Sequence, residues 1–263
     1  MRILATRRAA NILILLLGLL VPSSAGSQEP GTRLVPLYQQ QVNRRLVLPE
    51  EEQRRYATLL SQALTKAGLD NIPAQFLVLV DRDIRVQAAM IFWKSEFGDF
   101  HFIGASPVST GKPGRFEHFE TPLGVFPHTL ENFDFRAEGT LNEFGILGYG
   151  RKGMRIYDFG WIDAPKGWGD GRVSTMRLQM HATDPKILEP RLGSAQSKGC
   201  VRIPTSLNLF IDRYGILDAA YDRALSSGHQ LWVLSPDREP TPWSGQYLVV
   251  VDTERDRRPQ WSR

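Results

Sequence analysis

The sequence predicts a mainly β fold with added helices. Short apolar runs of strand length dominate the chain from residue 73 onward, and two helical patterns follow near the carboxyl end. Strands and helices do not alternate regularly, as they would in a doubly wound parallel sheet. We therefore expect a mostly antiparallel β domain that is preceded by a signal peptide and a short helical extension.

Residues 1–25 have the three parts of a secretory signal peptide. Arg2, Arg7 and Arg8 are followed by an apolar run, Ile12 to Val21, and then by the small residues Ser23-Ser24-Ala25. The apolar run is short for a transmembrane helix, which needs about 20 residues. We expect an exported protein in the periplasm of a Gram-negative-type bacterium, with no stable membrane insertion after cleavage; an uncleaved anchor is the alternative.

Residues 26–72 are expected to form a leader and an amphipathic helix. Prolines and glycines indicate irregular structure over 26–48. A helix is predicted to begin at Pro49, because three glutamates follow it and face the positive end of the helix dipole. Apolar residues with helical spacing continue to Ala67, and Gly68 is a plausible stop.

The region 73–235 is expected to form the main domain, and 236–263 a C-terminal extension. The first three predicted strands, separated by turn residues, favour a β-meander. The predicted strands are Phe76–Val80, Val86–Trp93, Phe100–Val108, Val125–Phe126, Met154–Phe159, Met176–His181 and Leu231–Leu234, and the predicted helices are Leu207–Tyr214 and Asp218–Ser226. A glycine- and aromatic-rich stretch, about 129–172, is a candidate loop over a functional site, although packing is an equally good explanation of any single aromatic residue.

The charge gives no case for nucleic-acid binding. The chain has 32 basic and 28 acidic residues, and three of the basic ones lie in the predicted signal peptide. The remainder is nearly neutral, without the basic surface that nucleic acid requires. We expect a monomer. The histidines also lack the spacing of a metal site, so no metal and no cofactor are expected.

Cys200 is the single cysteine and the strongest candidate for a nucleophile. It lies between Lys198 and Arg202, and nearby positive charge favours the thiolate. His181 ends a strand on its polar face, where it is a candidate general base. The alternatives are that Cys200 is a buried filler and that His181 is a solvated surface residue.

Two blocks of sequence resemble the L,D-transpeptidase catalytic domain (YkuD-type), a family of bacterial cell-wall enzymes. The first block runs His181-Ala182-Thr183, Leu192-Gly193, then Ser197-Lys198-Gly199-Cys200-Val201-Arg202. The second is Val108-Ser109-Thr110-Gly111-Lys112 followed by Thr121-Pro122-Leu123-Gly124-Val125-Phe126. The resemblance covers roughly 73–235. The chain departs from the family pattern at Lys198, where a second histidine is usual, and at Ala182, where glycine is common.

The resemblance implies a transferase of peptidoglycan stem peptides. Cys200 would be the nucleophile and His181 the base, with Ser197, Lys198 and Gly199 in the oxyanion loop. Backbone N–H groups at Gly199 and Cys200 are candidate oxyanion donors, and Arg202 and Thr183 are candidate substrate-binding residues. The donor would be a stem tetrapeptide cleaved before its terminal D-alanine. The acceptor stays open: a neighbouring stem gives a 3–3 cross-link, water gives an L,D-carboxypeptidase, and a protein lysine gives wall anchoring. The same residues also fit a cysteine peptidase of wall peptides or a non-catalytic wall-binding relative.

Overall fold

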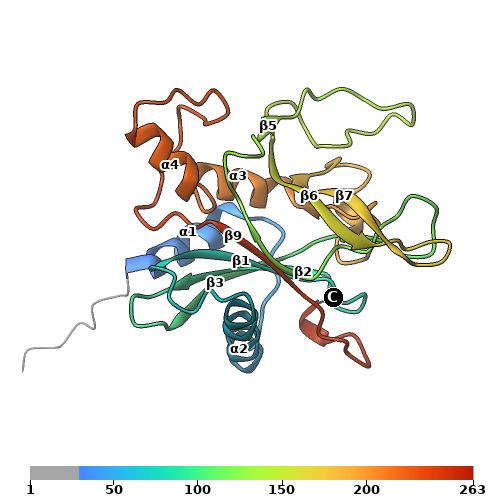
Figure 1. Ribbon diagram of the computed structural model, residues 1–263, viewed down its shortest axis with the longest axis horizontal. Coiled ribbons are helices and arrows are strands. Elements are labelled where there is room, and N and C mark those ends of the chain that lie inside the picture. The colour runs from blue at the N-terminus through green and yellow to red at the C-terminus, as the bar shows by residue number, and fades with distance from the viewer. Residues whose placement is uncertain (1–29, 263) are drawn as a thin grey trace, which may run out of the picture.

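Two mixed β-sheets and a few helices make up the part of the chain that the computed structural model describes, residues 30–262 (Figure 1). The predicted signal peptide lies outside these residues. The mainly β prediction is confirmed. No helix among the described residues is both long and apolar enough to cross a membrane.

The larger sheet has the strand order β3-β2-β1-β9-β4. Its strands are β1 (Gln75–Asp81), β2 (Ala88–Lys94), β3 (Phe100–Pro107), β4 (Gly124–Pro127) and β9 (Tyr247–Val251). The predicted meander of β1, β2 and β3 is confirmed, because both of its strand pairs are antiparallel. Strand β9 runs parallel to β1 and antiparallel to β4. The sheet is therefore mixed rather than purely antiparallel.

Helices cover both faces of the larger sheet. One face packs against α2 (Glu50–Lys66), the predicted amphipathic helix, through Tyr56, Leu60 and Leu64. The other face packs against α1 (Leu34–Gln41) and α3 (Thr205–Tyr214), which Figure 1 shows on the opposite side from α2. Strands β1 and β2 are buried along their whole length for this reason.

The smaller sheet has the order β5-β6-β7-β8 and carries the candidate site residues. Its strands are β5 (Phe135–Arg136), β6 (Arg155–Pro165), β7 (Val173–Ala182) and β8 (Val201–Ile203). The strands β6 and β7 form an antiparallel hairpin with a register shift between Asp158 and Trp161. Strand β8 pairs with β7 in parallel.

A buried ionic cluster joins this sheet to α3 and α4 (Ala219–Ser226). Arg155 of β6 is fully buried. Its Nε lies 2.7 Å from Asp134, and its Nη1 lies 3.3 Å from Asp212 and 3.1 Å from Asp218. Because a buried cation is tolerated only when it is paired, these contacts fix the position of β6 beneath the helices.

Several predicted elements differ from the structure. Leu231–Leu234 forms turns rather than a strand, and the leader contains α1. The expected C-terminal extension supplies β9, which lies between β1 and β4 in the larger sheet. The short 3-10 turns at Pro30–Arg33, Glu189–Arg191 and Gln260–Ser262 complete the described elements.

Candidate active site

The register of two parallel strands places the candidate nucleophile at the start of the strand that pairs with the candidate base, and no hydrogen bond joins the two side chains among the described residues. His181 of β7 lies opposite Arg202 of β8, and Met180 opposite Val201. Side chains alternate along a strand, and paired residues point to the same face of a sheet. Cys200 therefore lies on the face that carries His181, beside Gln179. The backbone of Gln179 favours ionisation of the Cys200 thiol, which fits this position.

His181 is buried and held in one tautomer. Its exposed fraction is 5%, so the alternative of a solvated surface residue is wrong. Its Nδ1 donates to the carbonyl oxygen of Ala182 at 2.6 Å, which leaves Nε2 as an acceptor. Burial, with a smaller contribution from the nearby Arg202 cation, lowers the pKa of His181 to about 4, and the hydrogen bond to Ala182 opposes this shift. The imidazole is neutral at pH 7 and able to accept a proton.

Cys200 is a neutral thiol rather than the thiolate that the neighbouring charges suggested. The residue is partly buried, and burial raises the pKa of its thiol more than the Arg202 cation lowers it. Its Sγ donates a long hydrogen bond, 3.7 Å, to the carbonyl oxygen of Arg177. Lys198 forms an exposed ion pair with Glu117, at 2.9 Å, instead of stabilising the sulfur.

The loop before Cys200 is held by side-chain hydroxyls. Ser197 Oγ donates to the carbonyl oxygen of Cys200 at 2.6 Å and accepts the N–H of Gly199 at 3.0 Å. Thr121 Oγ1 donates to the carbonyl oxygen of Gly199 at 2.7 Å and accepts the N–H of Gly111 at 2.9 Å. The two sequence blocks that carry the family resemblance therefore meet at this loop.

Gly199 is required for the shape of the loop. Its φ of 128° lies in the region that favours glycine, and a Cβ there would come within 2.7 Å of the Met176 sulfur. Its N–H is used by Ser197, so it is not free to stabilise an oxyanion, contrary to expectation. Within residues 30–262, nothing accepts a hydrogen bond from the N–H of Cys200. That N–H is the remaining donor of the predicted pair.

The two predicted substrate-binding residues differ in how well they can contact a ligand. Arg202 is partly buried, and its Nη1 makes one long contact, 3.5 Å, with the carbonyl oxygen of Gln196. Its Nε is buried and has no hydrogen-bond partner in the described chain. Thr183 is fully buried, so it has no surface with which to contact a substrate in this conformation. Arg202 is the better candidate.

A polar network that the sequence did not predict supports the site. The buried carboxylate of Asp158 accepts hydrogen bonds from Arg177 Nε at 2.7 Å and from Gln179 Nε2 at 2.8 Å. Tyr149 donates to Gln179 Oε1 at 3.1 Å, and its ring packs edge-on against His181 with centroids 4.7 Å apart. Tyr149 belongs to the segment that we expected to cover a site. For Arg177 and Gln179, the sequence signal was their alternation with apolar residues along the strand that ends near His181.

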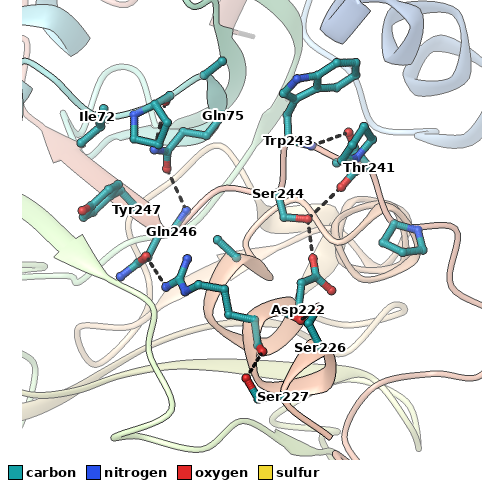
Figure 2. A pocket seen from close by; sticks show the side chains of 16 residues that line it. Ile72, Gln75, Asp222, Ser226, Ser227, Thr241, Trp243, Ser244, Gln246 and Tyr247 are labelled. Atoms are coloured by element: carbon teal, nitrogen blue, oxygen red, sulfur yellow. Dashed lines mark hydrogen bonds between the residues drawn. The ribbon is translucent and has the colours of Figure 1, made fainter.

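A cavity of about 1050 Å³ lies elsewhere, between α4, the start of β1 and the segment 240–247 (Figure 2). Its polar groups are largely paired with one another. Ser244 Oγ donates to Asp222 at 2.6 Å, and Arg223 donates to Gln246 at 2.9 Å. None of its lining residues belongs to β7, β8 or the Cys200 loop.

No family model matches this chain, and no curated protein is significantly similar to it. The described residues also contain no group of three or more histidine, cysteine and acidic residues that could hold a metal ion. What the site can do follows from its own residues: a thiol, a neutral imidazole on the same sheet face, a free backbone N–H and a cation together suit acyl transfer.

Proposed function

We propose that this protein is a cysteine-dependent acyltransferase of peptidoglycan stem peptides, an L,D-transpeptidase. The observation that carries the proposal is the parallel register of β7 and β8, which puts Cys200, His181 and Arg202 on one sheet face. The sequence blocks that resemble the L,D-transpeptidase family support the substrate class. They are joined in the fold by the hydrogen bond from Thr121 to Gly199.

The charge states favour attack coupled to proton transfer rather than a preformed ion pair. Cys200 Sγ forms a bond to the carbonyl carbon before the terminal D-alanine, while its proton passes to Nε2 of His181. The N–H of Cys200 stabilises the oxyanion. The carbon–nitrogen bond then breaks, and the imidazolium gives its proton to the leaving D-alanine amine. A thioester on Cys200 remains.

The acceptor decides which product forms. The amine of a neighbouring stem attacks the thioester and gives a 3–3 cross-link, a protein lysine gives wall attachment, and water gives an L,D-carboxypeptidase. In each case His181 removes the proton of the attacking group and the thiol is restored. A peptidase of wall peptides differs from these enzymes in its products alone.

The position of Lys198 weakens the non-catalytic alternative. That alternative, a wall-binding relative, rested on lysine replacing the histidine that is usual in the family. Lys198 is exposed and paired with Glu117, on the solvent side of the loop. Its side chain therefore makes none of the hydrogen bonds that hold the loop around Cys200, which come from Ser197 and Thr121.

Mass spectrometry of a purified stem tetrapeptide incubated with the protein tests the proposal. We expect release of D-alanine, a thioester adduct on Cys200, and either cross-linked dimer or tripeptide. Cys200→Ala should abolish turnover, and His181→Gln should lower it by about 10²–10⁴-fold, the usual contribution of a general base. Lys198→His should leave turnover within about tenfold, roughly 1.4 kcal/mol of activation free energy.

Two outcomes would count against the enzyme. One is a wild-type protein that forms neither product nor adduct under conditions where it is folded. The other is an inert wild type that gains turnover through Lys198→His, which would mean that lysine had disabled the site. The second outcome would favour the wall-binding relative.

A further inference from the structure

Four basic side chains line one cavity beside the Cys200 loop. The cavity has a volume of about 480 Å³, and none of the described residues that line it is acidic. Its lining residues are Lys112, Arg115, Leu188, Arg191, Gln196 and Arg202. Three of the four cations are exposed, whereas Arg202 at the inner end is partly buried.

These four cations have no acidic partners in the part of the chain that the structure describes. Among the described residues, none of them forms an ion pair within 4.0 Å. Other basic residues of the same domain do, including Arg82, Arg136 and Arg155. Concentrating unpaired charges of one sign costs stability through mutual repulsion, and it attracts ligands of the opposite sign. The arrangement is what an anion-binding site requires.

The backbone around the cavity is fixed by the same contacts that fix the nucleophile loop. The N–H of Lys112 donates to the carbonyl oxygen of Ser197 at 3.0 Å, and the N–H of Gln196 donates to Thr110 at 3.0 Å. Arg202 forms an antiparallel bridge with Ser109. The cations of the cavity are therefore attached to a rigid frame that also holds Cys200.

Arg202 connects the cavity to the thiol. Its Nε is buried without a partner, and its guanidinium has donors to spare beyond the single long contact with Gln196. A guanidinium presents a planar fork of donors that matches the two oxygens of a carboxylate or phosphate. An anion that filled this fork would be held two residues along the chain from Cys200, on the sheet face that carries the thiol.

We propose that this cavity is a subsite for a polyanionic group, one with two or more carboxylates or a phosphate, that Arg202 holds beside Cys200. One carboxylate would be satisfied by Arg202 alone. Arg115, Arg191 and Lys112 add three further cations, so a ligand with a single negative charge would leave most of them unpaired. The inference deepens the proposed function, because it specifies the charge of the substrate or of a group attached to it.

Isothermal titration calorimetry on the Cys200→Ala protein tests the subsite without turnover. The probes are tricarballylate, with three carboxylates, inorganic phosphate, and acetate as the monovalent control. We expect tricarballylate or phosphate to bind at least tenfold more tightly than acetate, with affinity that falls as salt is added. If tricarballylate is preferred, the group is a carboxylate cluster; if phosphate is preferred, it is a phosphate ester.

Charge-removing variants locate the binding. Arg115→Gln and Arg191→Gln should each weaken the preferred anion at least fivefold. Lys66→Gln removes one exposed, unpaired cation at the far end of α2 and should change the affinity less than twofold. Equal effects of all three variants, or no preference over acetate, would overturn the inference. Anion binding without turnover would refute the proposed function alone, and turnover without anion binding would refute this subsite alone.

Discussion

Acid should weaken the folded protein through His181, and the structure gives the size of the effect. The folded chain protonates this imidazole only near pH 4, because it is buried, whereas its ordinary pKa is 6.5. Between these values the unfolded chain binds more protons than the folded chain, so stability falls as the pH falls. Each pH unit is worth about 1.4 kcal/mol, so His181 lowers the free energy of unfolding by roughly 3 kcal/mol at pH 4.

Replacing the imidazole by a neutral amide should remove that loss. His181→Gln lowers the free energy of unfolding at pH 7 through lost packing. The difference in that free energy between wild type and variant should shrink by roughly 3 kcal/mol on going to pH 4. Urea unfolding at pH 4, 5, 6 and 7 measures the gap. His229→Gln is the matched control, because His229 is exposed on the chain after α4. A gap that is constant with pH, or one that closes equally in the control, would refute the assignment of a buried neutral His181.

Two other predictions follow from burial. Cys200 should react with iodoacetamide more slowly than free cysteine at pH 7, because burial raises the pKa of its thiol, and its rate should climb as the pH rises; a rate above that of free cysteine at pH 7 would contradict the neutral thiol. Arg155→Met should lower the free energy of unfolding by about 3–5 kcal/mol in urea, because it leaves Asp134 and Asp218 without their buried cation. Arg213→Met, which removes an exposed pair, should leave that free energy nearly unchanged; equal effects of the two variants would show that the buried cluster is not paired as described.

Local sequence patterns predicted the elements whose formation depends on local contacts. The apolar runs located β1, β2 and β3, and helical spacing located α2, α3 and α4. The helix α1 was missed because Pro36 is typical of irregular structure. Proline is tolerated there, since it lies in the first turn, where an N–H has no intrahelical partner.

Strand pairing over long sequence separations is not encoded in these local patterns. The run Tyr247–Val251 has strand composition, but nothing local says that it lies between β1 and β4. The three residues of β8 are too few to give a periodicity, and they owe their strand conformation to β7 and Ser109. Leu231–Leu234 shows the reverse case, an apolar run that forms turns; Arg136 of β5 reaches the carbonyl oxygen of Val233 through its side chain rather than through strand pairing.

The charge states of the candidate site residues were not predictable from their neighbours in the sequence. Lys198 and Arg202 flank Cys200 in the chain, and the expectation of a thiolate assumed that both charges act on the sulfur. In the fold Lys198 pairs with Glu117, which lies 81 residues away in the sequence. Burial, which a single sequence does not report, then determines the protonation of both Cys200 and His181.

The proposed anion subsite affects proton transfer from Cys200 to His181. The pKa of the thiol is raised and the pKa of the imidazole is lowered, and both shifts oppose that transfer. The cation of Arg202 opposes the protonation of His181. A substrate anion held against Arg202 would offset that cation, so the imidazole would become a stronger base and the thiol, whose ionisation the same cation favours, a weaker acid. Burial is the larger of the two causes of the low pKa, so the anion restores the smaller part. The N–H of Cys200 must therefore favour the transfer, by stabilising the oxyanion that forms as the proton moves from Cys200 to His181.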